Sequence, residues 1–139
     1  MAERALYLDS SALVKLVVEE PETHALGQAV AGRDLISSEI ALAEVQRAIR
    51  RLFSGRRNET REALSRAMES VLGALAFVPV DRKILLQAGS FHEMFLRTLD
   101  AIHAASALAV ADDIEWFVTY DGVQGDAVEV AGLPLLQPS

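Results

Sequence analysis

The sequence predicts an α/β sandwich in which helices cover both faces of a short, mainly parallel central sheet of about five strands. Segments of three to five apolar residues alternate along the chain with segments whose apolar residues recur at helical spacing. The 139 residues suit one compact domain, 1–139, and no linker, repeat or low-complexity segment divides them. The composition, 51% hydrophobic and 24% charged, is that of a protein with an ordinary apolar core.

The first half of the chain is predicted to form two strands and four helices. Pro21 suits the first turn of a helix, where its missing N–H costs no hydrogen bond. Ser38 is predicted to be the N-cap of the next one. In order, the predicted elements are a strand at 4–8, a helix at 11–20 with Leu13, Leu16 and Val17 inward, a helix at 21–32 closed by Gly32, a strand at 35–37, a helix from Ser38 with an apolar stripe of Leu42, Val45, Ile49, Leu52 and Phe53, and, after Gly55, a helix from Asn58 toward Leu75 with Ala63, Leu64, Ala67, Met68, Val71 and Leu72 inward.

The second half is predicted to form three strands and three helices. Asp81 and Thr98 are the expected N-caps of the first two helices. The second of them is apolar almost all round, so it is predicted to be buried. In order, the predicted elements are a strand at 77–80, a helix after Asp81 through Phe91, a helix at 99–111, a strand at 116–119, a short helix after Gly122 and a strand at 133–136.

Four acidic residues stand where an α/β sheet forms its binding site, beyond the carboxyl ends of the strands. Asp9 directly follows the first strand, and Asp121 directly follows the fourth. Glu44 lies in the second turn of a helix, off the apolar stripe, and Asp100 lies in the first turn of the helix 99–111. The order of the elements therefore predicts that these carboxylates converge.

Asp100 gives a reason to expect a bound cation. It belongs to a helix predicted to be buried, and a buried carboxylate without a cationic partner is costly. Arg97 is the only basic residue near it in sequence. Because the chain offers clustered carboxylates and has no cysteine, the expected ion is a hard one, Mg²⁺ or Mn²⁺.

Each acid also has a purely structural interpretation. Asp9 is a suitable cap for the helix that follows it, and Asp121-Gly122 is a common turn dipeptide. Asp100 suits the positive end of a helix dipole. Glu44 suits a solvated helix face.

The three histidines are poor candidates for metal ligands. His24 and His92 lie on helical segments far from strand ends in the sequence. His103 follows Asp100 by one helical turn, and we expect it to pack or to orient a neighbour rather than to coordinate.

The charge distribution and the composition limit which partners this protein can bind and in which cellular compartment it is expected. The net charge of −7 argues against a uniformly phosphate-binding surface, but the basic residues are concentrated. The concentration fits either a local guide for nucleic acid or a solvated helix face. The absence of cysteine excludes disulfides and thiol catalysis, and no signal peptide or membrane-length apolar run is visible, so a cytoplasmic protein is expected. Seven of the thirteen basic residues fall in one stretch: Arg47, Arg50, Arg51, Arg56, Arg57, Arg61 and Arg66.

Four motifs in order carry a family resemblance. YLDSSALVKL, SEIALAEVQRA, LRTLDAIHAASAL and FVTYD together resemble the PIN-domain fold, and more narrowly the VapC toxins of bacterial toxin–antitoxin pairs. The similarity covers almost the whole chain, including FVPVDRKIL and GLPLLQP. It implies a PIN-like three-layer α/β/α sandwich.

The resemblance assigns the site residue by residue. Asp9 and Glu44 match the first and second acids of the family, and Asp100 and Asp121 match the third and fourth. The segment after Asp121, GVQGDAVEVAG, departs from the family pattern, which leaves Asp126 as an alternative. Three hydroxyl residues beside the acids are expected to hydrogen-bond to them: Ser10, Ser38 and Thr119.

The resemblance also implies an activity and partners. The implied activity is metal-dependent endoribonucleolytic cleavage of RNA, with Arg47 and Arg51 among the arginines that hold phosphates. The implied partners are a second copy of the chain in a homodimer and a cognate antitoxin that blocks the acidic groove. Two alternatives stay open. One is a silent PIN scaffold that binds RNA or a protein. The other is an Asp-based phosphoryl-transfer domain, against which Ser11 stands where a phosphatase of that kind has a second Asp, and no lysine follows Lys83.

Overall fold

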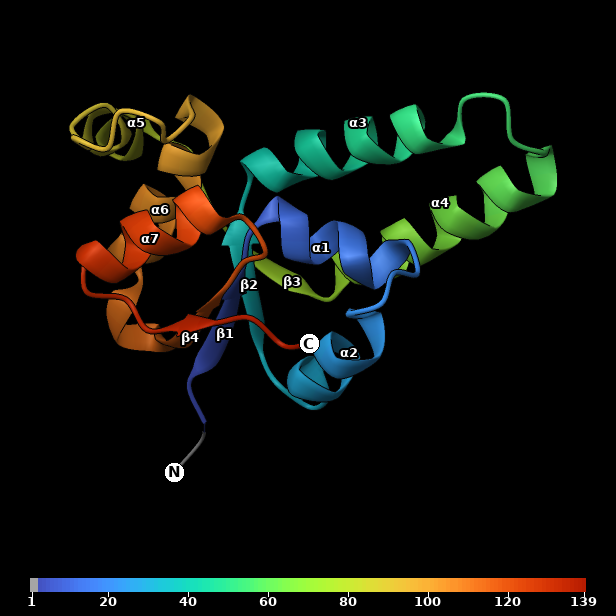
Figure 1. The fold of residues 1–139 in the computed structure, drawn as a ribbon, viewed down its shortest axis with the longest axis horizontal. Coiled ribbons are helices and arrows are strands. Elements are labelled where there is room, and N and C mark those ends of the chain that lie inside the picture. The colour runs from blue at the N-terminus through green and yellow to red at the C-terminus, as the bar shows by residue number, and fades with distance from the viewer. Residues whose placement is uncertain (1–2) are drawn as a thin grey trace.

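A computed structural model describes residues 3–139 and shows helices on both faces of a central sheet (Figure 1). The helices α1 to α4 lie on one side, and α5, α6 and α7 lie on the other. The elements are β1 (Ala5–Leu8), α1 (Ser10–Val17), α2 (Thr23–Val30), β2 (Leu35–Ser38), α3 (Ile40–Phe53), α4 (Asn58–Gly73), β3 (Leu75–Val78), α5 (Arg82–Ala88), α6 (Thr98–Ala109), a 3₁₀ turn (Ala111–Asp113), β4 (Ile114–Val118), α7 (Gly122–Val130) and β5 (Leu135–Leu136).

The five strands form one parallel sheet in the order β3-β2-β1-β4-β5. The chain runs outward from β1 through β2 to β3, and then returns to place β4 on the other side of β1. The strand order therefore reverses between β1 and β4, which is where open α/β sheets bind ligands. The two edge strands are short, since β5 has two residues and β3 has four and is followed by Pro79.

The core is divided by the sheet because alternate side chains of a strand point to opposite faces. Leu6 and Leu8 of β1 pack among the helices α1, α2 and α3. Tyr7 points to the other face, where its ring stacks on Phe117 with centroids 4.9 Å apart and lies among residues of α6 and α7. The predicted sandwich with a parallel five-stranded sheet is confirmed.

The start of α3 corrects two predictions. Ser38 is the last residue of β2 rather than an N-cap, because the neighbouring strand extends the pairing through Val78. Its hydroxyl still accepts a hydrogen bond from the Ile40 N–H at 3.2 Å. The apolar stripe is also rotated: Ala41 is buried, whereas Leu42 and Leu52 are 39% and 47% exposed. α3 therefore packs through Ala41, Val45, Ile49 and Phe53.

Other boundaries shift by a few residues. β3 ends before Pro79, which has no N–H for a strand ladder, so the predicted strand at 77–80 lies two residues too late. Thr98 is the first residue of α6 rather than its cap. α1 (Ser10–Val17) and α2 (Thr23–Val30) are shorter than the predicted helices at 11–20 and 21–32, and Pro21 lies in the turn before α2 rather than in its first helical turn. β4 begins at Ile114 and ends at Val118, and β5 is limited to Leu135–Leu136. α4 ends at Gly73 with Ala63 exposed, α5 ends at Ala88, before Phe91, and α6 ends at Ala109.

The N-cap of α5 is as predicted, since an Asp81 carboxylate oxygen accepts from the Ile84 N–H at 2.9 Å. The central part of α6 is buried, as its all-round apolar pattern predicts. Within residues 3–139, no helix combines the length and the hydropathy needed to span a bilayer.

Candidate active site at the carboxyl ends of β1 and β4

Asp9 lies at the carboxyl end of β1 and is only 2% exposed. Its Oδ1 accepts hydrogen bonds from the Ser11 hydroxyl at 2.6 Å and from the Ala12 N–H at 3.1 Å, and its Oδ2 accepts one from the Thr119 hydroxyl. Burial raises the pKa of Asp9, and the charge of His103 together with these donors offsets part of that rise. The residue does cap α1, and it also keeps one unused lone pair, on Oδ2.

Glu44 reaches the same region from α3 and is half-buried. Its Oε1 accepts from the Ser10 hydroxyl at 2.6 Å and lies 2.7 Å from Nε2 of His103. Burial raises the pKa of Glu44, but the hydrogen bonds and the charge contributed by His103 and Ser10 outweigh it, and the net pKa is lowered. Glu44 is therefore a carboxylate at neutral pH with one oxygen held by the protein.

Asp100 is less buried than its helix suggested. It lies half-exposed in the first turn of α6, and no hydrogen bond joins its carboxylate to another of the described residues. Its pKa is raised to about 6, first by burial and then by the charges of Asp121 and Asp9, with a smaller contribution from Glu44. The four acids are thus close enough to repel one another.

Asp121 caps α7 and is the most accessible of the four. Its Oδ1 accepts from the Gln124 N–H at 3.0 Å, and its own N–H donates to the Thr119 hydroxyl at 3.0 Å. Thr119 donates in turn to Asp9. A single hydroxyl at the end of β4 thereby fixes the relative positions of two acids.

Two of the three hydroxyl residues predicted to hydrogen-bond to the acids do so, and one does not. Ser10 and Thr119 do hydrogen-bond to acids, but within residues 3–139 no hydrogen bond joins Ser38 to an acid. Sequence reasoning missed Ser11, which donates to Asp9 and accepts from the Tyr120 N–H at 3.0 Å. Its position directly after Asp9-Ser10, in the first turn of a helix, was the available signal.

The structure also shows where the three histidines and Asp126 lie relative to the four acids. His103 lies beneath the acids, 1% exposed, with Tyr7 on one ring nitrogen and Glu44 on the other, as expected for an orienting role. His24 and His92 are exposed elsewhere. Asp126 is exposed on α7 and does not contribute to the raised pKa of Asp100.

The donor set has the chemistry of a hard-cation site. Unused lone pairs remain on Asp9 Oδ2, Glu44 Oε2 and Asp121 Oδ2, and both oxygens of Asp100 are free of hydrogen bonds to the rest of 3–139. Carboxylate oxygens are the ligands that Mg²⁺ and Mn²⁺ prefer. Within the part of the chain described, no three His, Asp or Glu side chains stand close enough together to enclose an ion directly. Ligation partly through water, as Mg²⁺ commonly adopts, is compatible with that spacing.

A cleft of about 580 Å³ opens beside the acids. Glu44, Ser10 and Ser11 line it together with Arg47 and Arg51, so these two arginines share a cavity with Glu44, one of the four acids. Sequence reasoning missed a third cation that lines the cleft, Lys15. Its ammonium bonds to Glu20 and Glu22 and lies 4.8 Å from the centre of the Tyr120 ring.

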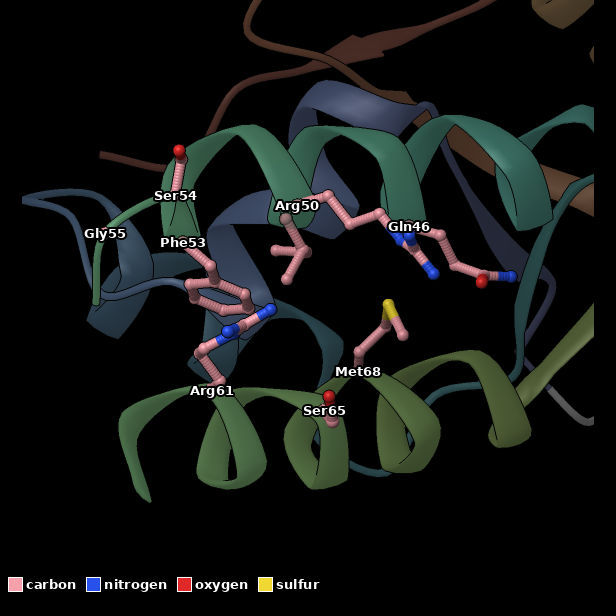
Figure 2. A pocket seen from close by; sticks show the side chains of 9 residues that line it. Gln46, Arg50, Phe53, Ser54, Gly55, Arg61, Ser65 and Met68 are labelled. Atoms are coloured by element: carbon pink, nitrogen blue, oxygen red, sulfur yellow. The ribbon is translucent and has the colours of Figure 1, made fainter. Parts of the chain in front are cut away.

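A second cavity, of about 650 Å³, lies between α3 and α4. Figure 2 shows the side chains of Arg50 and Arg61 directed into it from the two helices, near Phe53 and Met68. α3 thus presents arginines to cavities on two of its faces. Among residues 3–139, none of the seven arginines between 47 and 66 forms an ion pair with an acid.

A family model and similar proteins of known sequence indicate the same family for this chain. The PIN domain model matches residues 6–128. The chain is 40% identical to ribonuclease VapC46 of Mycobacterium tuberculosis over 136 residues, which cover 97% of this chain and 98% of that protein. It is 33% identical to ribonuclease VapC47 of the same species over 121 residues, 84% of each chain.

Solved structures agree on the fold. Mycobacterium tuberculosis VapC20, described as a toxin that cleaves the sarcin–ricin loop, superposes with a TM-score of 0.71 at 17% identity and covers 96% of this chain and 100% of that one. A chain of Rickettsia felis VapBC2, solved with a DNA fragment from its promoter, superposes with a TM-score of 0.69 at 16% identity, over 97% of this chain and 99% of that one. With its parallel sheet and its acids gathered at the switch point, the chain belongs to the PIN-domain family and, within it, to the VapC ribonucleases.

Proposed function

We propose that this chain is a Mg²⁺- or Mn²⁺-dependent endoribonuclease that hydrolyses RNA phosphodiesters in the cleft beside Asp9. The observation that carries the proposal is that four carboxylates from separate elements meet at the switch point of the sheet, and that among the described residues no arginine or lysine forms an ion pair with them. The pKa of Asp100, raised to about 6 first by burial and then by the charges of Asp121, Asp9 and Glu44, is consistent with it. Such an arrangement favours binding of a divalent cation, which relieves the repulsion.

The acids have distinct roles in this proposal. Asp9, Asp100 and Asp121 would hold the ion, in part through water, with the unused lone pair on Oδ2 available in Asp9. Glu44 would bind it through water or position the attacking water with Oε2, since Oε1 is held by Ser10 and His103. When bound, the ion supplies an activated water and neutralises charge on the phosphate.

The arginine-rich segment would hold the RNA. Residues 47–66 contain seven arginines and two glutamates, in a chain whose net charge is −7. Arg47 and Arg51 line the cleft and are the nearest candidates for contacts to phosphates that flank the cleaved bond. Binding to this face would therefore depend strongly on salt concentration.

The partners follow from the family. A cognate antitoxin would inhibit the enzyme by covering the acidic cleft, and the chain would act in the cytoplasm as a homodimer. Relatives named VapC, and the VapBC2 structure among the similar folds, support the antitoxin. Co-purification from the native operon tests this part: a second small protein bound in stoichiometric amount is expected, and a chain that is unpartnered and harmless on expression would contradict it.

Cleavage of a fluorogenic RNA with Mn²⁺ tests the activity. We expect EDTA to abolish cleavage and Asp9→Asn to reduce it at least about 100-fold while the circular dichroism spectrum stays unchanged. Asp112→Asn is the matched control, because Asp112 is exposed in the 3₁₀ turn at the opposite end of the sheet. Asp126→Asn tests the alternative acid. Equal cleavage by the wild type and Asp9→Asn would refute the proposal.

The match to the PIN domain model argues against the Asp-based phosphoryl-transfer domain. The same cleavage assay distinguishes the ribonuclease from the other alternative, a catalytically silent PIN scaffold. A silent PIN scaffold would bind the RNA without cleaving it, and its binding would not change with EDTA. The four acids present at the switch point favour the enzyme.

A further inference from the structure

His103 is a buried polar residue with a partner on each ring nitrogen. Its Nδ1 lies 2.8 Å from the Tyr7 hydroxyl oxygen, and its Nε2 lies 2.7 Å from Glu44 Oε1 and 3.1 Å from the Ser10 hydroxyl. The three partners come from β1, α3 and the start of α1. One imidazole on α6 therefore joins four elements of the fold beneath the acidic cleft.

The partners determine where the protons lie. Nε2 of His103 lies 2.7 Å from Glu44 Oε1, and because a carboxylate only accepts hydrogen bonds, Nε2 carries a proton and donates it. Burial raises the pKa of the Tyr7 hydroxyl well above its usual value, so Tyr7 keeps its proton. Its hydroxyl can donate to Nδ1 of a neutral ring or accept from Nδ1 of a charged ring, and it holds Nδ1 in either case. Ser10 donates to Glu44 and accepts a second, longer contact from Nε2. The chain of hydrogen bonds runs from Tyr7 through His103 to Glu44.

This chain of hydrogen bonds orients a carboxylate. Both donors to Glu44, from Ser10 and His103, reach the same oxygen, Oε1. Among the described hydrogen bonds Oε2 receives none, and Glu44 lines the cleft, so Oε2 is the oxygen left for a ligand there. Glu44 has three side-chain torsions and would otherwise sample several orientations.

His103 also restrains Asp100. The two residues are three positions apart on α6, about one helical turn. Because Tyr7 and Glu44 hold the ring from opposite sides, the first turn of α6 cannot rotate about its axis without breaking one of these hydrogen bonds. The distance between Asp100 and Glu44 is thereby restrained by a residue that is itself out of the cleft.

We infer that His103 is a positioning residue, held by Tyr7, that directs Glu44 Oε2 into the cleft and restrains Asp100 relative to it. The inference rests on the proposed function, because it concerns the geometry of that same acidic site. His103 is 1% exposed and Tyr7 is fully buried, so neither residue contacts RNA.

Three variants test the inference. Tyr7→Phe removes one oxygen and keeps the stack on Phe117. His103→Leu removes both ring nitrogens, and His103→Gln keeps an amide N–H near the position of Nε2. Ile102→Val is the control for loosening of α6, because Ile102 is the buried neighbour of His103 and has no polar contact through its side chain.

Kinetics and metal binding give the first readout. We expect kcat to fall about 10- to 100-fold in His103→Leu, with KM for RNA nearly unchanged and a weaker affinity for Mn²⁺ measured by calorimetry. His103→Gln should recover most of the loss, and Ile102→Val should behave like the wild type. Tyr7→Phe should show a smaller loss in kcat of the same kind.

Nitrogen-15 NMR of the imidazole gives a readout independent of catalysis. His103 is the buried histidine of the three, so its ring signals are distinguishable by slow proton exchange. The expected spectrum has a protonated Nε2 in the wild type and a changed Nδ1 shift in Tyr7→Phe. An unprotonated Nε2 would overturn the inference.

The outcomes separate the two proposals. If Asp9→Asn is inactive while His103→Leu and Tyr7→Phe keep the kcat of the wild type, the inference on His103 is wrong and the ribonuclease stands. If Ile102→Val loses as much kcat as His103→Leu, the positioning role is likewise refuted. If Asp9→Asn cleaves like the wild type, the proposed function itself fails. Should His103→Leu not fold, Tyr7→Phe still decides the question.

Discussion

Replacing Asp100 with asparagine should stabilise the metal-free protein at neutral pH while it impairs the enzyme. The native pKa of Asp100, about 6, lies above the ordinary value of 3.8, so the folded state binds this proton more tightly than the unfolded chain does. The ionised carboxylate therefore destabilises the fold. This cost is small below about pH 4, grows between the unfolded pKa and the native pKa, and is complete above about pH 7.

The size of the effect follows from the shift. A rise from 3.8 to about 6 corresponds to about 3 kcal/mol for a fully buried group. Because Asp100 is half-exposed, solvent screening reduces this to roughly 1–1.5 kcal/mol. For a domain of this length the gain amounts to a rise in Tm of about 3–5 °C.

Thermal unfolding in EDTA is the assay, with Asp112→Asn as the control for loss of an exposed acid. We expect Asp100→Asn to melt above the wild type at pH 7.5, and the gain at pH 4.5 to fall to about a third of that value. Adding Mn²⁺ should stabilise the wild type more than the variant. A variant that melts at or below the wild type at pH 7.5 in EDTA would refute the reasoning, because it would mean that the charge of Asp100 is not a cost to the metal-free fold.

Three further changes test other parts of the structure. Gln124→Leu should raise the free energy of unfolding by about 1–2 kcal/mol in urea titrations, because the buried Gln124 amide has no hydrogen-bond partner among residues 3–139; an unchanged or lower value would show that the amide is satisfied. Thr119→Val should destabilise the protein by about 1–3 kcal/mol and lower kcat about 10- to 100-fold, since it removes the donor to buried Asp9; unaltered chemical denaturation and kcat would contradict this. Arg51→Ala should weaken RNA binding in filter assays and reduce the slope of log K against log salt concentration by about 0.7 for each phosphate that Arg51 neutralises, whereas a parallel line would exclude such a role.

The acidic site was predicted well from the positions of acids at strand ends, whereas the inward faces of the helices were predicted less well. Asp9 directly follows β1, and Asp121 lies three residues after the end of β4, so the parallel order of the strands brings them together. The prediction of the inward face of α3 was wrong at Leu42 and Leu52, because hydrophobicity alone does not show which apolar residues pack against α1 and α4. Small Ala41 occupies the close contact, and the two leucines remain exposed.

The hydrogen bonds around the acids could not be predicted from spacing. Tyr7 and His103 are 96 positions apart, and Thr119 and Asp9 are 110 apart, so their contacts depend on the packing of complete elements. The burial of α6 was predicted correctly, but the half-exposure of Asp100 was not. The periodic pattern describes a whole helix, whereas the first turn of α6 lies at the rim of the cleft.

The short edge strands restrict how any partner recognises this protein. β5 pairs over two residues, and β3 offers four residues before Pro79. A partner that extends a sheet needs a row of free N–H and C=O groups along an edge, and these edges provide little of it. A protein that captures this chain must therefore contact side chains on the helices or in the cleft. Its specificity will consequently depend on individual charges and apolar residues, which single substitutions in either partner can change.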